Sequence, residues 1–475
     1  MLAVLYKGKE MVFSSLTFLF AYFPVVLAVY FVCPPKWRNL VLLIVSLFFY
    51  GWGEPVYVLM MIFSIIANWF FGKMVGKYRT DDKEKAKKWL IACVVFNLLL
   101  LGFFKYWDFF AENMNAIGLS FIKPLHLGLP IGISFYTFQA MSYPIDVYRS
   151  DTDPQKSVIS FGAYVTMFPQ LIAGPIVRYK DIAAQLMSRR ENLNQFYEGV
   201  LRFTVGLSKK VLLANSCGQV FEAVRALPAS QSSVIASWVG IICYTFQIYF
   251  DFSGYSDMAI GMGKMFGFDF LENFNYPYIS KSVTEFWRRW HMSLSYWFRD
   301  YVYIPLGGNR RGFRRQIINI MIVWLLTGFW HGASWNFVIW GVFYGIVLII
   351  EKLFLLKKLE KMPEWLTHVY TMFIVIIAWV FFAFTDLSQA VKYLGTMFGF
   401  ASSFVNKEAI FFLRNNLVLM CVAAIACSPI AKSDLNPFRR ERFSVLIAPL
   451  VLIAFIVCTA FIVDASYNPF LYFRF

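Results

Sequence analysis

Charged side chains are scarce in this sequence. Asp, Glu, Lys and Arg together make up 15% of its 475 residues, whereas they form about a quarter of a typical soluble domain. Hydrophobic residues reach 59%, and several apolar runs approach the roughly 20 residues that cross a bilayer as a helix. The shortage of charge therefore excludes an ordinary soluble globular protein, and the continuity of the runs disfavours the alternating pattern of a membrane β-barrel.

Paired cysteines and the common catalytic motifs are also missing. The 7 Cys are scattered singly without a CxxC pair, which indicates packed free thiols rather than disulfides or a metal cluster. Only 4 His are present, and none lies in an HxxxH or HExxH motif, so we expect no zinc site. The sequence also lacks a GxSxG nucleophile elbow and a complete phosphate-binding loop. We therefore expect no metal and no permanently bound cofactor.

What the sequence does contain is a series of long apolar segments. They are residues 12–32, 89–104, 234–250, 317–329, 337–350, 369–384, 417–430 and 445–463. Because lipid offers backbone groups no hydrogen-bond partner, such segments are expected to be helices. The predicted fold class is an all-α polytopic membrane protein without a soluble domain. The first run lacks the cleavage site of a signal peptide and is expected to remain as a helix. Residues 1–10, before Met11, are expected to be a dispensable extension.

The net charge of +16 comes mainly from short basic loops between the apolar runs. These loops are residues 73–88, 178–190, 310–315, 352–361 and 439–442. The positive-inside rule explains loops of this kind without a nucleic-acid partner, and attraction to anionic lipid headgroups accompanies it.

We predict one integral-membrane domain over residues 1–475. Within it, the apolar segments differ in character between four regions. Residues 1–110 form N-terminal hairpins, residues 337–465 form ordinary C-terminal helices, and residues 466–475 form an aromatic tail. Between them, residues 124–336 contain segments broken by Gly, Pro and polar residues, at 129–135, 167–176 and 250–257. Broken helices occur at membrane depth only where protein covers them or where they line a wet cavity. We therefore expect the catalytic core in residues 124–336.

Two histidines in this core are the sharpest candidates for chemistry. His291 lies in FWRRWHMSLS (residues 286–295) and His331 lies in LLTGFWHGASW (residues 325–335). An imidazole in apolar membrane sequence is a candidate functional group, and His331 is predicted to be a general base that deprotonates an acceptor hydroxyl. The alternative is a buried structural histidine that hydrogen-bonds to a backbone carbonyl. The neighbouring tryptophans are candidates to line the substrate chamber: Trp287, Trp290, Trp330 and Trp335.

Other polar residues support the same chamber. Asp251 and Asp257 stand in an aromatic apolar stretch, and buried membrane carboxylates tend to be paired, with Arg178 as one possible partner. The tail, SYNPFLYFRF, ends directly after an apolar run. It either forms an interfacial aromatic belt or inserts into a cavity, where Tyr472 would offer a hydroxyl near the histidines.

Six sequence motifs, taken in order along the chain, resemble the membrane-bound O-acyltransferase family. The resemblance is closest to the bacterial branch that O-acylates alginate, peptidoglycan and other envelope polysaccharides. The motifs are MVFSS (11–15), FPQLIAGPI (168–176), DFSGYSDMA (251–259), NFNYPY (273–278), FWRRWHMSL (286–294) and TGFWHG (327–332).

The resemblance implies an acyltransferase of the bacterial cytoplasmic membrane with a funnel through the bilayer. It implies His331 as the catalytic residue and His291 as a second active-site residue, with acetyl-CoA or another acyl thioester as donor. It also implies an exported partner of the SGNH-esterase type, a polysaccharide acceptor, and transient attachment of the acyl group to Tyr472. Two readings compete with it: a transporter or flippase with a histidine proton relay, and a scaffolding membrane subunit. Inverted repeats that would favour the transporter are not evident in the sequence.

Overall fold

The structure is a computed structural model that describes residues 11–119, 121–432, 446–464 and 467–471. Within these ranges the chain is helical, and its only extended pairing is an isolated bridge between Ser233 and Ser403. The predicted all-α membrane class is confirmed. The expectation for residues 1–10 falls outside the described residues. Seven described segments are long and apolar enough to cross a membrane: α4 (Tyr57–Tyr78), α5 (Lys83–Ala116), α12 (Val234–Met265), Trp335–Leu359, α18 (Glu364–Ala383), α20 (Lys407–Ala426) and α22 (Ile447–Asp464).

The chain forms two compact units. The first comprises Met1–Phe203 and Tyr255–Leu271, and the second comprises Thr204–Gly254 and Glu272–Phe475. Two helices, α10 (Leu193–Ser208) and α12, therefore contribute residues to both units. Both histidines that we singled out belong to the second unit.

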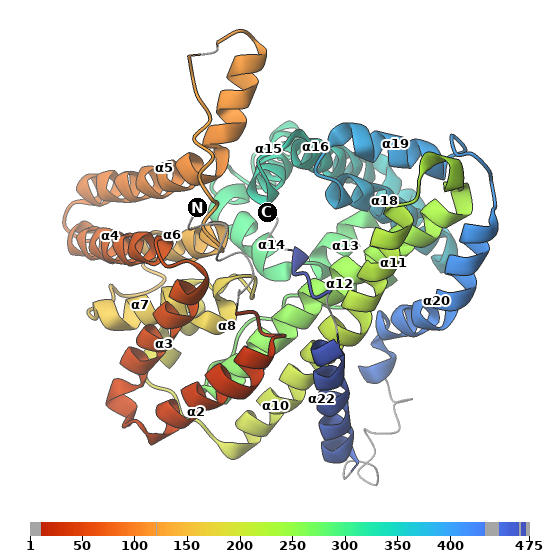
Figure 1. Cartoon of the computed structure of the whole chain (residues 1–475). Coiled ribbons are helices and arrows are strands. Elements are labelled where there is room, and N and C mark those ends of the chain that lie inside the picture. Colours follow the sequence, from red (N-terminus) through yellow and green to blue (C-terminus); the bar gives the residue numbers. More distant parts are fainter. Residues whose placement is uncertain (1–10, 120, 433–445, 465–466, 472–475) are drawn as a thin grey trace. The chain divides into compact units, whose positions relative to one another are not determined.

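Helices α4 and α5 pack together in the first unit, with α6 (Ile133–Arg149) beside them (Figure 1). Asn68 of α4 and Asn97 of α5 exchange amide hydrogen bonds of 3.1 and 2.7 Å in the buried interface. Gly72 lets Tyr143 of α6 approach, because a Cβ at Gly72 would lie 2.1 Å from the tyrosine ring. The other helices of this unit are α2 (Phe23–Val32), α3 (Arg38–Gly53), α7 (Val158–Thr166), α8 (Phe168–Leu171) and α9 (Tyr179–Met187).

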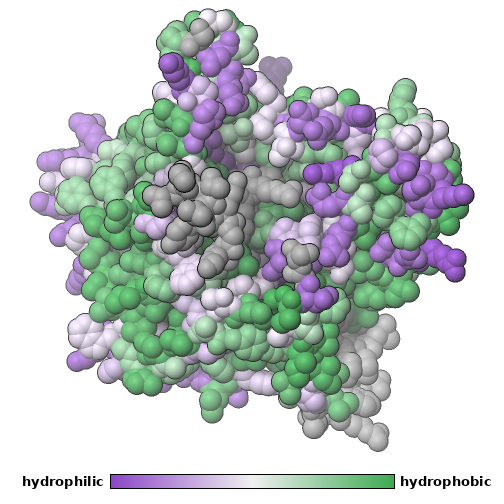
Figure 2. Space-filling view, in the orientation of Figure 1, coloured by the Kyte–Doolittle hydropathy of each residue, from purple (hydrophilic) through white to green (hydrophobic). Residues whose placement is uncertain are grey.

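Apolar side chains cover the outward surfaces of several helices, as expected for contact with lipid. Figure 2 shows hydrophobic residues over α3 and over α22. On α22, Leu452, Ile453 and Ile456 are each more than half exposed. Water would not favour such surfaces, which supports a membrane environment for these helices.

Helices α15 (Phe313–His331) and α16 (Trp335–Ile350) form a close pair in the second unit (Figure 1). A Cβ at Gly328 would lie 2.4 Å from the carbonyl oxygen of Phe337, and one at Gly341 would lie 2.5 Å from that of Trp324. These glycines therefore bring the two backbones together, as small residues do in membrane helix pairs. The other helices of this unit include α11 (Asn215–Arg225), α13 (Val283–Arg289), α14 (Met292–Phe298), α17 (Leu356–Leu359) and α19 (Leu387–Met397).

The predicted breaks in the core are confirmed at two of three places. Helix α6 begins only after Gly132, whose φ is +71°, and residues 167–176 contain only the four-residue helix α8. The break expected at residues 250–257 is wrong, because α12 runs through them without interruption. The polar residues that suggested this break have partners on other segments: Asp251 pairs with Lys210, and Asp257 pairs with Arg202.

Candidate functional site

His291 lies at a sharp turn between two short helices of the second unit. Helix α13 ends at Arg289, and α14 begins at Met292. His291 itself has a φ of +46°, which is uncommon for a residue with a side chain. Two backbone hydrogen bonds of 2.9 Å, from Asn275 N–H to Arg289 and from Met292 N–H to Asn273, hold this turn against residues 273–275.

The side chain of Asn273 fixes the orientation of the His291 ring. Its Oδ1 accepts hydrogen bonds from the N–H and hydroxyl of Ser293, at 3.3 and 2.9 Å, and lies 3.0 Å from His291 Nδ1. Because that oxygen is an acceptor, Nδ1 of His291 carries the proton and Nε2 carries the lone pair. His291 lies outside the seven candidate spans, and burial lowers its pKa to about 3. The ring is therefore neutral near pH 7.

His331 ends helix α15 inside a cage of aromatic rings. The residue is 4% exposed, and its ring centroid lies 5.0 Å from that of Trp340 and 5.2 Å from that of Phe382. Gly332 makes room for this packing, because a Cβ there would lie 2.3 Å from the Phe337 ring.

One indole connects the two histidines. The centroid of Trp330 lies 5.8 Å from that of His291 and 5.0 Å from that of His331. Residues 40 positions apart in the sequence are thus brought to the same tryptophan, as expected if both belong to one site.

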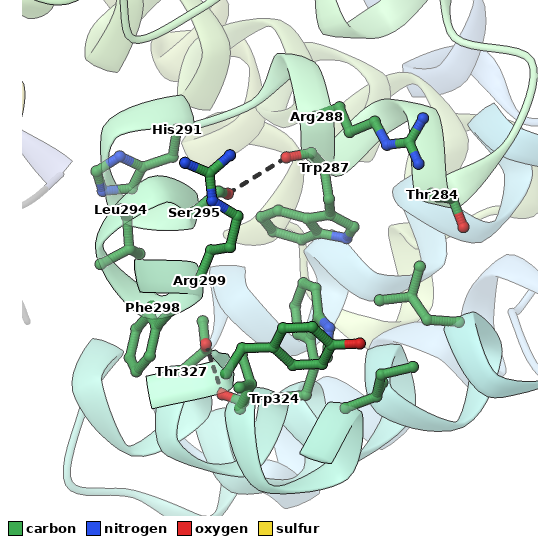
Figure 3. A pocket seen from close by; sticks show the side chains of 14 residues that line it. Thr284, Trp287, Arg288, His291, Leu294, Ser295, Phe298, Arg299, Trp324 and Thr327 are labelled. Atoms are coloured by element: carbon green, nitrogen blue, oxygen red, sulfur yellow. Dashed lines mark hydrogen bonds between the residues drawn. The ribbon is translucent and has the colours of Figure 1, made fainter. Parts of the chain in front are cut away.

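A cavity of about 260 Å³ opens beside His291 (Figure 3). Trp287 and Trp324 form one wall, with ring centroids 4.6 Å apart. The predicted residues His291 and Trp287 line the cavity; His331, Trp290, Trp330, Trp335, Asp251, Asp257 and Arg178 are not among its lining residues. The complete lining is Thr284, Trp287, Arg288, His291, Leu294, Ser295, Phe298, Arg299, Tyr303, Ile320, Val323, Trp324, Thr327 and Leu348.

Arg288 and Arg299 give this mainly apolar cavity a positive edge. Arg299 contacts Asp300 at 2.7 Å, whereas no ion pair of Arg288 is present in the part of the chain that the structure describes. An apolar cavity with a guanidinium at its edge can accept a ligand that has both an apolar and an anionic part.

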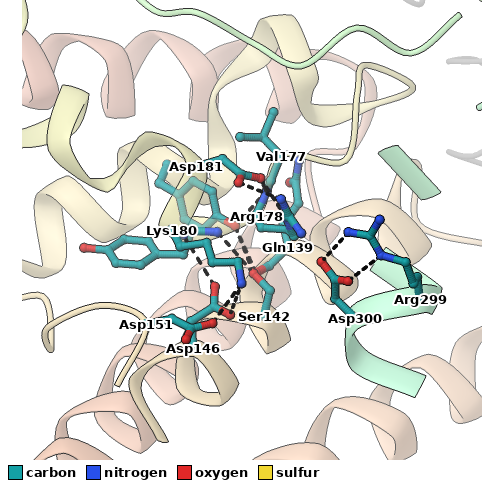
Figure 4. Close-up of polar contacts among 12 residues, drawn as sticks. Gln139, Ser142, Asp146, Asp151, Val177, Arg178, Lys180, Asp181, Arg299 and Asp300 are labelled. Carbon is teal, nitrogen blue, oxygen red and sulfur yellow. Dashed lines mark hydrogen bonds and ion pairs between the residues drawn. The ribbon is translucent and has the colours of Figure 1, made fainter. Parts of the chain in front are cut away.

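The other predicted polar residues form ion pairs within their own units. Asp251 contacts Lys210 at 2.8 Å in the second unit, and Asp257 contacts Arg202 at 2.6 Å in the first. Arg178 contacts Asp181 at 2.8 Å, where α9 begins. Figure 4 shows this contact and, close to it, Lys180, which lies 2.8 Å from Asp151 and 3.9 Å from the fully buried Asp146.

Comparison with known proteins identifies the chain. The model of the family described as MBOAT, membrane-bound O-acyltransferase family, matches residues 149–388, which include both histidines and the whole cavity lining. A Pseudomonas putida protein named probable alginate O-acetylase AlgI is 39% identical, over 98% of this chain and 100% of that protein. The chain belongs to the membrane-bound O-acyltransferase family.

Other relatives of this acyltransferase have different acceptors in their names. The peptidoglycan O-acetyltransferase of Helicobacter pylori is 34% identical, over 98% of each chain. The teichoic acid D-alanyltransferase of Bacillus subtilis is 26% identical, over 60% of this chain and 73% of that protein. The predicted family and acyltransferase class are confirmed, and the transporter reading is not favoured.

Three residues of this acyltransferase that support the site were not predicted from the sequence. Asn273 orients His291, Lys210 neutralises Asp251, and the fully buried Glu351 accepts hydrogen bonds from the first residues of α13. Lys210 was detectable, because a lysine in an apolar segment is as unusual as a histidine. Asn273 lies in one of the family-like motifs. Glu351 follows directly on an apolar run, and nothing local distinguishes it from a residue of the basic loop that it precedes.

Proposed function

We propose that this membrane-bound O-acyltransferase takes an acyl group from a cytoplasmic thioester, and that the acyl group is acetyl and the donor acetyl-CoA. The acyl group then crosses the bacterial cytoplasmic membrane for O-acylation of an exported or cell-envelope polysaccharide. Relatives named for alginate and peptidoglycan O-acetylation, matched over nearly the whole chain, support this acceptor class.

The observation that carries the proposal is the shared contact of His291 and His331 with Trp330, beside a cavity with a positive edge. In the proposed reaction the acceptor oxygen attacks the thioester carbonyl carbon while His331 takes the hydroxyl proton. The C–S bond then breaks, and the imidazolium returns the proton to the leaving thiolate. His331 is the last residue of α15.

The cavity beside His291 is the proposed donor site. Its apolar walls suit the acyl and pantetheine part of a thioester, and Arg288 suits a phosphate at its edge. His291 would hold the donor through Nε2, the ring nitrogen that Asn273 leaves as an acceptor.

Tyr472 is the proposed first acceptor of the acyl group. Its hydroxyl oxygen would form the ester while the thiol leaves, and an exported partner of the SGNH-esterase type would later move the acyl group to the polysaccharide. Tyr472 lies outside the described residues. The described tail, residues 467–471, immediately precedes it.

The test uses the purified full chain in lipid nanodiscs with acetyl-CoA labelled in the acetyl group. We expect covalent labelling of the chain, a loss of at least 100-fold in its rate for His331→Ala, and no labelling for Tyr472→Phe. General-base catalysis contributes about 10²–10⁴-fold, which sets this scale. His368→Ala is the matched control, since His368 is hydrogen-bonded to the backbone carbonyl of Ser280 and is not among the cavity-lining residues. Full labelling of His331→Ala would exclude His331 as the base, and full labelling of Tyr472→Phe would exclude the tyrosine relay.

A further inference from the structure

A buried ion pair lies beside the candidate site and has no part in the proposed chemistry. Lys210 Nζ lies 2.8 Å from Asp251 Oδ1, and the two side chains are 4% and 2% exposed. Lys210 belongs to a π-helical turn, Lys209–Ala214, between α10 and α11. Such turns are rare and often occur at functional positions.

The remaining hydrogen-bonding capacity of this pair is directed at the chain's own C-terminal tail. Lys210 donates to the carbonyl oxygen of Pro469, and Asp251 Oδ2 accepts the N–H of Leu471 at 2.9 Å. The third contact of the ammonium group is Asn215 Oδ1, at 2.8 Å. Two groups in this network, the Pro469 carbonyl and the Leu471 N–H, belong to the tail main chain.

Side-chain contacts of the tail add to these main-chain contacts. Asn215 Nδ2 donates to Asn468 Oδ1 at 3.1 Å, and Phe470 and Leu471 are 7% and 5% exposed. Tyr467 fits against α11 at Gly218, where a Cβ would lie 2.8 Å from the tyrosine hydroxyl. Residues 467–471 of the tail therefore contact the rest of the second unit along their whole length.

The energetics indicate that the pair does more than stabilise the fold. Removing two charges from water is costly, and replacing a buried ion pair with apolar residues is often neutral or stabilising. In some proteins, buried polar and ionic groups instead specify one geometry. Here the pair contacts the main chain at positions 469 and 471. The neighbouring contacts of the Asn468 side chain and the buried Phe470 side chain distinguish this register from one shifted by a residue.

The ion pair of Lys210 and Asp251, called the anchor below, is adjacent in sequence to a residue that contacts His291. Phe252 follows Asp251 in α12, and its ring centroid lies 4.7 Å from that of His291 in an edge-to-face contact. The last anchored residue of the tail, Leu471, is also the last one before Tyr472.

We propose that Lys210 and Asp251 are positioning residues that dock the C-terminal tail in one register. They fix the point from which its acyl-accepting end begins. This inference rests on the proposed relay through Tyr472, but docking itself can be measured without any acyl transfer.

The first experiment tests docking on the full chain in nanodiscs by hydrogen–deuterium exchange of the C-terminal peptide. The double variant Lys210→Met/Asp251→Leu removes both charges together, because a single substitution would leave an uncompensated buried charge. We expect its tail amides to exchange at least tenfold faster than those of the wild type, with exchange in α15 and α16 unchanged. Lys264→Met, which removes an exposed pair with Glu198, is the matched control. Equal tail exchange in the double variant and the wild type would overturn the proposal.

The second experiment tests register. One glycine inserted between Leu471 and Tyr472 shifts the acceptor away from the anchor, whereas one inserted between Ala465 and Ser466 leaves the anchored residues and everything after them in register. We expect the downstream insertion to lower kcat for acetyl labelling at least tenfold without changing KM for acetyl-CoA, and the upstream insertion to be tolerated. Equal activity of the two insertions would show that register is irrelevant and would overturn the proposal.

The two proposals fail in different ways. If the wild-type chain shows protected tail amides but no labelling from acetyl-CoA, docking stands and the proposed relay is wrong. If labelling is normal in the double variant while its tail exchanges freely, the relay stands and the positioning role of Lys210 and Asp251 is wrong.

Discussion

At the scale of single residues, His291 is held in a strained backbone conformation. A residue with a side chain at a φ of +46° carries a strain of about 1–3 kcal/mol. The backbone hydrogen bonds between this turn and residues 273–275 hold the strained conformation. Both histidines are recognisable in the sequence because each stands out in apolar surroundings. Asn273 is not recognisable there as the partner of His291, because the fold makes that contact across 18 positions.

Asn273→Asp tests whether Asn273 controls the proton on His291. A carboxylate still accepts from Nδ1, but its charge favours the imidazolium and raises the His291 pKa from about 3. In its proposed role His291 acts as a neutral ring, so we expect the acid limb of kcat to move to higher pH. Asn273→Ala, which lacks the acceptor and the charge, should lower kcat about 10-fold or more without that upward shift. A pH–rate profile of Asn273→Asp identical to that of the wild type would contradict this role.

At the scale of helices, the apolar runs predicted most of the spanning helices. Polar residues inside one run led to the wrong prediction of a helix break. The runs at 369–384 and 445–463 correspond to α18 and α22, with ends shifted by at most five residues, whereas the run at 89–104 is only the middle of the much longer α5. The break expected at residues 250–257 does not exist, since Lys210 and Arg202 neutralise the two aspartates that suggested it. A sequence shows that a carboxylate is buried in apolar surroundings, but not which distant cation compensates it.

Helix α13, which leads to His291, depends on one carboxylate from another element. Glu351 accepts from the N–H groups of Val283 and Thr284 at 2.7 and 2.8 Å, so it caps the helix from outside. Glu351→Ala leaves these donors buried without their acceptor, and we expect it to destabilise the fold by about 2–4 kcal/mol and to lower Tm in intrinsic-fluorescence melting. Glu360→Ala, at an exposed site nine residues later, is the control. Equal melting of the two variants would show that the cap is dispensable.

At the scale of the whole molecule, the basic loops predict an orientation of the chain in the membrane. Residues 352–361 are basic, and the positive-inside rule predicts that they lie on the cytoplasmic side. Helix α22 follows a second basic stretch, residues 439–442, and its 18 residues rise about 27 Å, close to the thickness of the hydrocarbon core. Asp464 at its end is therefore expected on the exported side, which is where a tail that hands an acyl group to an exported partner has to start.

Single-cysteine labelling tests this orientation. In a variant without the native Cys residues, an impermeant maleimide added to intact cells should label Asp464→Cys and leave Lys361→Cys unlabelled until the membrane is permeabilised. Both positions are exposed in the structure, so a difference between them reports the side of the membrane rather than burial. Labelling of Lys361→Cys in intact cells would reverse the topology. The tail would then begin on the donor side, and delivery of the acyl group to an exported acceptor would require a route other than Tyr472.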